Sequence, residues 1–261
     1  MQNNFCNELV SIVVPVFNAA RFLERTLECI GGQSFEQWEL LLVDDASTDD
    51  SVRIIKRWIS AQKERKNRIL LLRNHSNRGP AYSRNRGVRA ARGRYLCYLD
   101  ADDYWNREKL EKQYRFMKER GCAFSFTGYA FADSAGRCRG RTVHVPRQLT
   151  YREALVNTTI STITVMLDRR QIPERLLLMP ENCEREDTAA WWKILRSGRT
   201  AWGLDEALSV YCRHRNSHSS NKLWAVWGTW RLYRRQEGLP PGKALRCMAG
   251  YLAGALRRRL P

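Results

Sequence analysis

Hydrophobic positions in the first hundred residues occur in short runs that alternate with stretches of helical spacing. Short, largely apolar runs such as SIVVPVF and WELLLV are typical of strands that are buried on both faces. The predicted strands are residues 11–17, 38–43, 69–72 and 95–99. Apolar residues three and four positions apart predict the intervening helices, at residues 22–30, 49–59 and 81–91. Strands that alternate with helices predict right-handed crossovers and a mostly parallel sheet, so this is an α/β chain.

The regular alternation of predicted strands and helices ends after residue 105. Two further helices are predicted at residues 107–119 and 187–196. Three further strands are predicted at residues 122–131, 163–167 and 207–211. We expect one domain over residues 1–220, with a nucleotide-binding half at 1–105, a second half at 106–220 and a separate tail at 221–261.

The tail is rich in aromatic and basic residues. Tryptophans at 224, 227 and 230 are followed by arginines at 231, 234 and 235, and a second amphipathic stretch follows Pro240 and Pro241. The apolar positions assigned to one face of that stretch are Leu245, Met248, Leu252, Ala255 and Leu256. Interfacial helices combine such apolar faces with basic ones. Two interpretations stay open: the tail lies on an anionic membrane surface, or it packs on the domain with its basic face in water.

Charge and cysteine content narrow the class of protein. The chain has 261 residues and a formal net charge of +18, which favours an anionic partner: nucleic acid, an acidic membrane face or a phosphorylated substrate. Hydrophobic residues make up 43%, so a sizeable core can form. The eight cysteines contain no CxxC pair and are expected to be free thiols. With neither a signal peptide nor a spanning run of about 18 apolar residues, we expect a cytoplasmic protein, with contact at the inner face of the membrane as a further option.

Three aspartates follow the strand predicted at residues 95–99: Asp100, Asp102 and Asp103. Ligands of open parallel sheets bind beyond the carboxyl ends of the strands. On an extended backbone Asp100 and Asp102 would point to the same side, about 7 Å apart. Their mutual repulsion would become attraction around a hard divalent cation such as Mn²⁺ or Mg²⁺. The structural alternative is an acidic turn that caps the following helix.

A second acidic corner, Asp44 and Asp45, follows the strand at residues 38–43. An ionised carboxylate there can accept a hydrogen bond from the imide N–H of uracil or from a ribose hydroxyl. The alternative is that it caps the helix that begins near Asp49. Its position at the same edge of the sheet favours a role in binding.

Five motifs occur in a fixed order along the chain. They are PVFN at residues 15–18, VDDAS at 43–47, NRGPA at 77–81, SRN at 83–85 and LDADD at 99–103. This series resembles the family 2 inverting glycosyltransferases of the GT-A fold, which build lipopolysaccharide, capsule and related glycans. The resemblance is strong over residues 11–103 and thin beyond, to about residue 222.

The resemblance implies a Rossmann-like GT-A domain and a donor site for a nucleotide-diphosphate-sugar, with UDP as the nucleotide. The residues it assigns to the donor are Pro15, Phe17, Asn18, Asp45, Arg84, Asp100, Asp102 and Asp103. Phe17 stands where the family has tyrosine, so stacking on the base survives but the phenolic hydrogen bond is lost. Arg84 would approach the base or the diphosphate, and Asp102 would bind the metal, Mn²⁺ or Mg²⁺.

The same resemblance places the acceptor in the second half of the domain. Glu186 and Asp187 look like the family's Glu-Asp pair at the start of a helix, and Asp187 is the expected catalytic base for the acceptor hydroxyl. A concerted displacement lets an ordinary carboxylate act on an alcohol. The alternative is that both acids only complement the helix dipole. The acceptor would be a glycan or a lipid-linked glycan.

A loop after the last predicted strand contains Arg213 and His214, whose donors suit the oxygens of a diphosphate. We expect this loop to close over the leaving group, unless it is simply a solvated basic loop.

Two other functions fit parts of the composition. A basic nucleic-acid-binding protein would use the charge and the tail, but no binding motif of that class is present and the carboxylates would repel phosphates. A sugar-nucleotide pyrophosphorylase needs a glycine-rich phosphate loop after the first strand, which residues 15–20 do not provide. The same missing glycines argue against a dehydrogenase. We expect no nucleic-acid partner.

Overall fold

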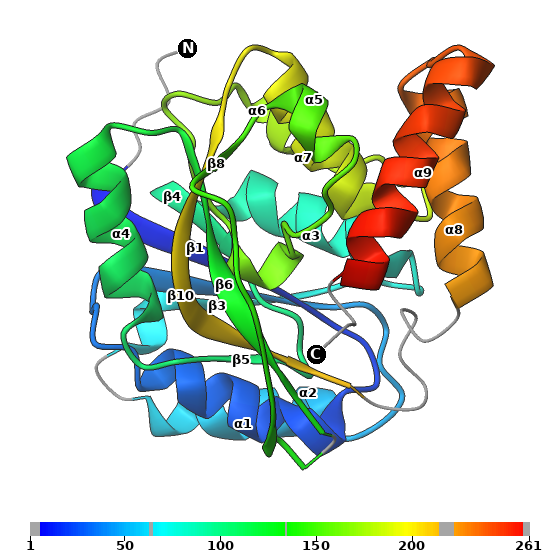
Figure 1. Ribbon diagram of the computed structural model, residues 1–261. Helices are drawn as coiled ribbons and strands as arrows, with labels where there is room; N and C mark the ends of the chain where they lie inside the picture. Colours follow the sequence, from blue (N-terminus) through cyan, green and yellow to red (C-terminus); the bar gives the residue numbers. More distant parts are fainter. Residues whose placement is uncertain (1–5, 63–64, 134, 214–221, 258–261) are drawn as a thin grey trace.

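The protein is built around one ten-stranded sheet (Figure 1). A computed structural model describes residues 6–62, 65–133, 135–213 and 222–257. The strand order is β3-β2-β1-β4-β9-β6-β10-β5, with β7 beside β6 and β8 beside β10. The strands are β1 (Cys6–Val16), β2 (Trp38–Asp44), β3 (Ile69–Arg73), β4 (Gly93–Tyr98), β5 (Tyr104–Trp105), β6 (Phe124–Ala132), β7 (Cys138–Val143), β8 (Gln148–Leu149), β9 (Met166–Asp168) and β10 (Ala201–Cys212).

Most of these strands run in one direction. β1 pairs in parallel with β2 and β4, and β2 pairs in parallel with β3. β9 lies antiparallel to both β4 and β6, so β6 and its parallel partner β10 point the same way as the first four strands. The mostly parallel α/β sheet predicted from the alternating pattern is confirmed. The carboxyl ends of β1, β2 and β4 therefore lie at one edge.

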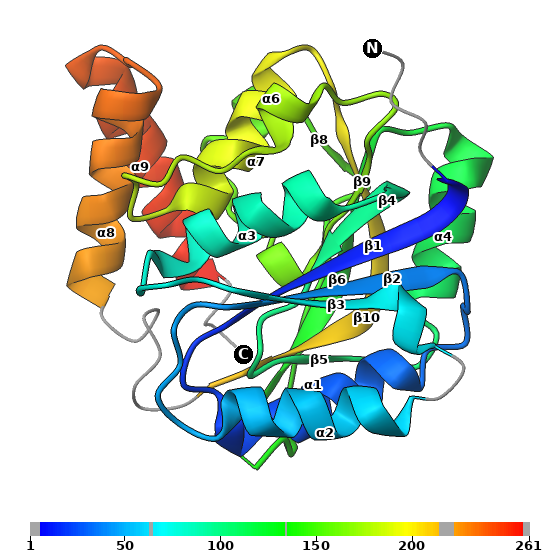
Figure 2. The same cartoon turned by 180° about the vertical axis from the view of Figure 1, so that it is seen from behind.

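Helices cover both faces of the sheet (Figures 1 and 2). The helices of eight or more residues are α1 (Ala20–Gly31), α2 (Ser51–Ala61), α3 (Gly79–Ala90), α4 (Lys109–Arg120), α7 (Glu186–Arg196), α8 (Lys222–Arg231) and α9 (Pro241–Arg257). α1, α2 and α4 contribute to one hydrophobic cluster with Ile12 and Val14 of β1. α3, α7 and α9 contribute to the other, with Val13 of the same strand. Strand β1 is thus buried on both faces, which explains its continuous apolar run. Two short helices, α5 (Tyr151–Ala154) and α6 (Glu174–Leu177), lie between β8 and α7.

Three predicted strands differ from the structure by three or more residues at one end, and the first of them, expected at 11–17, begins at Cys6. The strand expected at 163–167 is wrong in its first half, because residues Thr162–Thr164 form a 3-10 turn, η2, and the strand is Met166–Asp168. The strand expected at 207–211 is longer, Ala201–Cys212. Its pairing with β6 shifts register between Leu204 and Ser209. The polar pair Asp205 and Glu206 falls in this irregular stretch, and it hides the strand from a search for apolar runs.

The C-terminal helices pack on the domain rather than standing apart from it. The rings of Trp192 and Tyr233 stack with centroids 5.3 Å apart, which ties α7 to the π-helical turn η4 (Leu232–Gln236) between α8 and α9. The carboxylate of Glu237 accepts a hydrogen bond from Arg196 at 3.2 Å. Residues from both sides of position 220 share one hydrophobic cluster. Among the described residues, no helix has the length and apolar character needed to cross a membrane.

The apolar face predicted for the last helix is wrong in one member. Met248 is 7% exposed and lies with Ala244 and Tyr251 on the packed face of α9, whereas Leu245 and Leu252 are exposed. Apolar residues occur around most of this helix, so their spacing alone does not separate its inner face from its outer face. The side chains of residues 255–257 lie outside the description.

Candidate active site

The three aspartates after β4 form a tight acidic turn. The amide N–H of Asp103 donates to the carbonyl oxygen of Asp100 at 3.1 Å, so the extended backbone assumed for these residues is wrong. Asp100 and Asp102 are partly exposed, whereas Asp103 is 1% exposed. The carboxylate of Asp103 accepts the N–H of Cys212 at 2.7 Å. Burial, together with the negative charges of Asp102 and Asp100, raises the pKa of Asp103 well above its usual value.

The acidic turn is held against α1 by Arg25. The guanidinium of Arg25 donates to the carbonyl oxygen of Asp102 at 3.0 Å and lies 4.9 Å from the ring centre of Tyr104. The hydroxyl of Thr26 donates to the carbonyl oxygens of Ala101 and Asp103, each at 2.9 Å. The backbone of the turn is therefore fixed, and its two partly exposed carboxylates lie at the sheet edge.

Arg84 joins the acidic turn to the start of α7. Its Nη2 lies 2.6 Å from Oδ1 of Asp100 and its Nη1 lies 2.8 Å from Oε1 of Glu186. The side chain is only 7% exposed. Burial opposes the charged form, but the two carboxylates outweigh it and raise the pKa of Arg84. For Glu186 burial is the larger effect, and it raises the pKa of this carboxyl despite the ion pair with Arg84. The resemblance placed Arg84 near the base or the diphosphate, but here its guanidinium lies between two carboxylates, one on each half of the domain.

Asp187, the predicted catalytic base, lies beside this bridge. Its Oδ2 accepts the hydroxyl of Thr162 at 2.8 Å, and its Oδ1 accepts the amide of Thr188 at 2.6 Å. The side chain is partly exposed, so it can still reach a ligand. These two donors orient the carboxylate. Arg84 thus brings the two predicted acidic groups, which are more than eighty residues apart in sequence, to one place.

Thr162 is itself anchored to the acidic turn through its neighbour. The indole Nε1 of Trp105 donates to the carbonyl oxygen of Ile163 at 2.8 Å, and the hydroxyl of Ser209 donates to the same oxygen at 3.1 Å. Trp105 lies two residues beyond Asp103. The η2 turn therefore connects the orientation of Asp187 to the acidic turn.

Replacing Thr162 by valine removes the donor to Asp187 with almost no change of shape. We expect kcat to fall about tenfold, because a misaligned base costs rate, while KM for the nucleotide-sugar changes little. Initial-rate kinetics with varied donor would measure both constants. Thr159→Val is the matched control, because Thr159 is also buried and its hydroxyl has no partner among the described residues. An equal loss in both variants, or an unchanged kcat in Thr162→Val, would contradict the positioning role.

The tips of β1 and β2 lie side by side next to the acidic turn. The amide of Asp45 donates to the carbonyl oxygen of Val16 at 2.8 Å, and the amide of Leu99 donates to that of Val13 at 3.1 Å. The Asn18 side-chain oxygen accepts the amide of Thr48 at 2.9 Å, which locks the two loops together. Asn18 has a positive φ of 47°, a conformation that asparagine tolerates better than most residues.

The carboxylate of Asp45 is buried and already accepts hydrogen bonds from the protein, so it is not open to a ligand as the prediction assumed. It is 3% exposed, and its oxygens accept the amides of Arg78 at 3.0 Å and Gly79 at 2.7 Å and the side chain of Asn74 at 2.6 Å. Gly79 has a φ of +84°, which suits glycine at this first position of α3. In the structure Asp45 therefore holds the start of α3, and its contact with a nucleoside stays a prediction.

Phe17, a predicted donor residue, is open to solvent. It is 49% exposed just after β1, while Pro15 before it is half-buried. A large exposed ring at this edge is available for stacking on a planar ligand. Of the two residues predicted to close over the diphosphate, Arg213 lies with its guanidinium 3.6 Å from the ring centre of Phe131. His214 lies outside the described residues.

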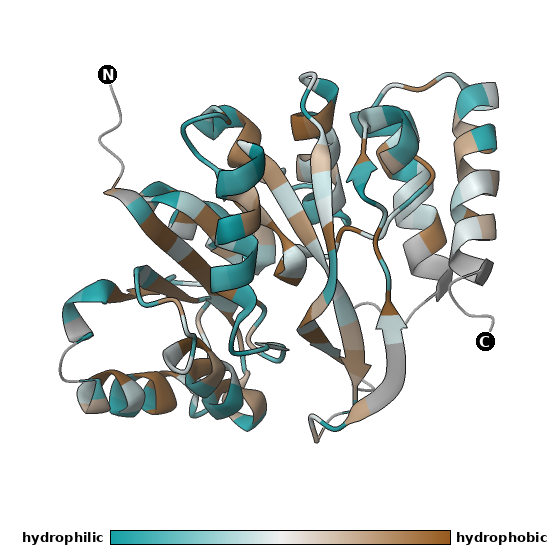
Figure 3. Cartoon of the chain, turned by 60° about the vertical axis from the view of Figure 1, so that its left-hand side comes forward, coloured by the Kyte–Doolittle hydropathy of each residue, from teal (hydrophilic) through white to brown (hydrophobic). Residues whose placement is uncertain are grey.

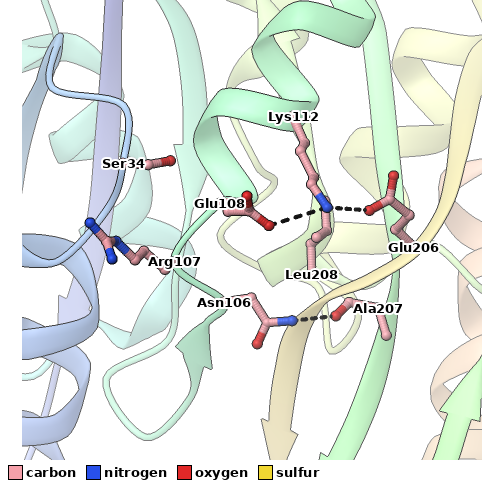
Figure 4. Close-up of a pocket in the computed structure, with 8 residues that line it drawn as sticks. All are labelled: Ser34, Asn106, Arg107, Glu108, Lys112, Glu206, Ala207 and Leu208. Atoms are coloured by element: carbon pink, nitrogen blue, oxygen red, sulfur yellow. Dashed lines mark hydrogen bonds and ion pairs between the residues drawn. The ribbon is translucent and has the colours of Figure 1, made fainter.

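A surface depression of about 830 Å³ lies elsewhere, between the start of α4 and β10 (Figure 4). Lys112 lies at its wall, 2.8 Å from Glu206 and 3.3 Å from Glu108. Asn106 donates to the carbonyl oxygen of Ala207 at 2.7 Å. None of its lining residues belongs to the predicted site, and Lys112 is paired with both glutamates in Figure 4. We assign it no role in the chemistry.

Sequence reasoning missed three residues that position the site: Arg25, Thr162 and the bridging role of Glu186. Each acts on a partner far away in sequence, from 25 positions for Thr162 to 102 for the pair of Arg84 and Glu186. No local motif marks such pairs. In the sequence these polar residues look the same as polar residues at the surface.

A divalent cation at this edge would need ligands beyond the carboxylates of the described residues. In the part of the chain that the structure describes, no group of three or more His, Cys, Asp or Glu residues could hold a metal ion. Asp102 can offer carboxylate oxygens of the kind that Mg²⁺ and Mn²⁺ prefer. Such ions are commonly bound by one or two carboxylates plus the phosphates of a substrate, so the donor set fits a metal that arrives with a diphosphate.

Comparison with known families and proteins gives a consistent result. Residues 11–176 match the family model described as "Glycosyl transferase family 2". TuaG of Bacillus subtilis, named as a teichuronic acid biosynthesis glycosyltransferase, is 41% identical over 252 residues, which cover 97% of this chain and 98% of TuaG. WfaP of Escherichia coli, a UDP-Glc:alpha-D-GlcNAc-diphosphoundecaprenol beta-1,3-glucosyltransferase, is 31% identical over 216 residues, which cover 83% of this chain and 82% of WfaP.

Solved structures of low sequence identity share the fold. Residues 1–349 of TarS from S. aureus, in complex with UDP-GlcNAc, match with a TM-score of 0.72 at 20% identity, over 93% of this chain and 71% of that 1–349 chain. The mannosyltransferase PcManGT of Pyrobaculum calidifontis, in complex with GDP-Man and Mn²⁺, matches with a TM-score of 0.67 at 21% identity, over 95% of this chain and 75% of that one. At these identities the likeness establishes the GT-A fold alone.

Proposed function

The chain belongs to glycosyl transferase family 2, and on that premise we propose that it moves a sugar from a UDP-sugar to the hydroxyl of a lipid-linked glycan, with inversion. The product would be a step in the synthesis of a bacterial surface polysaccharide. Two similarities support the substrate class: WfaP is named for a UDP-glucose donor and a diphosphoundecaprenol acceptor, and TarS is complexed with UDP-GlcNAc.

One observation carries the proposal: Arg84 bridges the acidic turn after β4 and the first turn of α7. The turn offers carboxylates to the donor side, and Asp187 offers one to the acceptor side. A base and a leaving-group site on opposite sides of a sugar are what a single displacement needs. Neither half of the domain provides both.

In the proposed reaction Asp187 accepts the proton of the acceptor hydroxyl as that oxygen bonds to the anomeric carbon. The bond from the anomeric carbon to the diphosphate oxygen breaks in the same step, so the configuration inverts. Thr162 and Thr188 hold the carboxylate of Asp187 in place. Phe17 stacks on the uracil, and Arg213 faces the departing phosphates. A divalent cation bound through Asp102 would supply positive charge to the leaving diphosphate.

A panel of nucleotide-sugars tests the proposal. We expect UDP-sugars with Mn²⁺ or Mg²⁺ to raise the melting temperature by roughly 5–10 °C at about 100 times Kd, because a ligand that binds only the folded state stabilises it. The donor that gives the largest shift is then supplied with an undecaprenyl-diphosphate-linked sugar, and transfer is followed by mass spectrometry. The proposed donor class is wrong if no UDP-sugar shifts the melting temperature or is consumed, and a GDP- or dTDP-sugar does shift it and is consumed.

A further inference from the structure

The outer side of the two C-terminal helices carries exposed apolar side chains next to basic ones. α8 and α9 lie side by side at one flank of the molecule (Figures 1 and 3). The exposed apolar side chains are Trp227 at 51%, Leu245 at 65% and Leu252 at 41%. The exposed basic ones are Arg234, Arg235, Lys243 and Arg246. We call these seven residues the flank surface.

The apolar members are not the edge of the core. On α9 the packed side consists of Ala244, Cys247, Met248 and Tyr251. Leu245, Ala249 and Leu252 follow one another at spacings of four and three on the exposed side. Of the six large hydrophobic side chains that are exposed in the described part of the chain, three belong to the flank surface. Such a concentration marks an interaction site rather than scattered surface residues.

The charge of the flank surface selects the partner. Between residues 226 and 254 the sole acidic residue is Glu237, whose side chain is 3% exposed and is paired with Arg196. The exposed charges of this segment are therefore positive, and they fit an anionic partner. A second copy of the chain would place these positive charges against one another. Nucleic acid would leave the leucines without an apolar environment. An anionic bilayer accommodates both, because its headgroups attract basic side chains and its interface receives apolar ones.

The flank surface is joined directly to the catalytic side of the domain. Gly228 of α8 faces Glu184 and Arg185, since a β-carbon added at this glycine would lie 3.5 Å from the side chain of each. Arg231 pairs with Glu184, two residues before Glu186. A bilayer bound at the flank surface would thus lie on the side of the molecule where α7 begins.

We propose that the flank surface docks the protein on a bilayer that contains anionic phospholipids, with Leu245, Leu252 and Trp227 in the interface and Arg246 among the headgroups. Docking is a property of the folded chain alone and needs neither a donor nor turnover. Its failure would therefore leave the proposed sugar transfer untouched.

Vesicle co-sedimentation tests the docking. The full chain is mixed with vesicles of equal parts phosphatidylglycerol and phosphatidylcholine, or of phosphatidylcholine alone. We expect binding to the first and little to the second. The double variant Leu245→Glu/Leu252→Glu should lower the partition coefficient at least about tenfold, because it removes apolar burial and adds negative charge. Leu70→Glu is the matched control, since Leu70 is 44% exposed on β3. The role of charge is tested in the same way with Arg246→Glu, and Lys56→Glu is its control because Lys56 is an exposed cation on α2.

Circular dichroism and melting temperature establish that each variant is folded. The proposal is overturned if the double variant binds the anionic vesicles like the unchanged protein, or if Leu70→Glu loses as much binding. It is also overturned if the double variant abolishes a dimer seen by sedimentation velocity without changing vesicle binding. The surface would be assigned to nucleic acid instead if the protein stayed bound to DNA at salt concentrations that release it from vesicles. In that case the Leu245→Glu/Leu252→Glu variant would bind DNA as well as the unchanged protein.

Discussion

Asp187→Asn is expected to lower kcat about a thousandfold, because loss of a positioned general base typically costs 10²- to 10⁴-fold. Asparagine has nearly the same shape: its one side-chain oxygen can still accept the amide of Thr188, and its NH₂ group can donate to the hydroxyl oxygen of Thr162. The fold and the binding of UDP should therefore be unchanged. Transfer of radiolabelled sugar gives kcat, and titration calorimetry with UDP gives the affinity.

Glu186 is the comparison for this experiment, since it lies next in sequence and on the same first turn of α7. Its carboxylate is already bound by Arg84 at 2.8 Å, so Glu186→Gln should affect stability more than the proton transfer. If Asp187→Asn keeps more than about a tenth of the unchanged kcat, while Glu186→Gln loses most of it, the base has been assigned to the wrong carboxylate.

Arg84→Met should destabilise the protein more than any surface charge change. Removing one partner of a buried ion pair leaves the others uncompensated and typically costs about 3–5 kcal/mol. Here Asp100 and Glu186 would both lose their cation. Urea unfolding followed by circular dichroism would give the free energy of unfolding. Arg84→Lys should recover part of the loss, because a single ammonium group cannot present the two-pronged fork of arginine to two carboxylates.

The pair of Arg53 and Asp50 provides the matched control for Arg84. Its side chains are 73% and 59% exposed, so Arg53→Met should cost less than about 1 kcal/mol. Adding Glu186→Gln to Arg84→Met should restore stability, since it removes one of the stranded charges. Equal destabilisation by Arg84→Met and Arg53→Met, or no rescue in the double variant, would show that the bridge does not join the two halves.

The elements with strong local patterns could be predicted from the sequence. β1 and β2 are runs of apolar residues buried on both faces, and each is followed by a helix whose apolar residues share a face. The order of strands and helices then dictates a parallel sheet and places the two acidic corners at one edge. The two-residue strand β5 was beyond such reasoning, because it exists through its antiparallel pairing with β10.

The members of the candidate site could be named from the sequence more completely than their contacts. The acidic turn and Asp187 could be found because they belong to motifs. The bridge from Arg84 to Glu186 and the contacts of Thr162 and Arg25 could not be predicted, because they join segments far apart in the chain. The same holds for Asp45: its motif suggests a ligand, whereas only the fold reveals that Asn74 and Gly79 already donate to it.

Calorimetry of UDP binding tests most directly whether the acidic turn is the donor site. The unchanged protein should bind UDP with Mn²⁺ present, and chelator should weaken the affinity at least about tenfold. Asp102→Ala should bind UDP equally weakly with and without Mn²⁺, while Asp187→Asn should bind it like the unchanged protein. If Asp102→Ala binds UDP as tightly as the unchanged protein, with the same response to Mn²⁺, the donor site lies elsewhere.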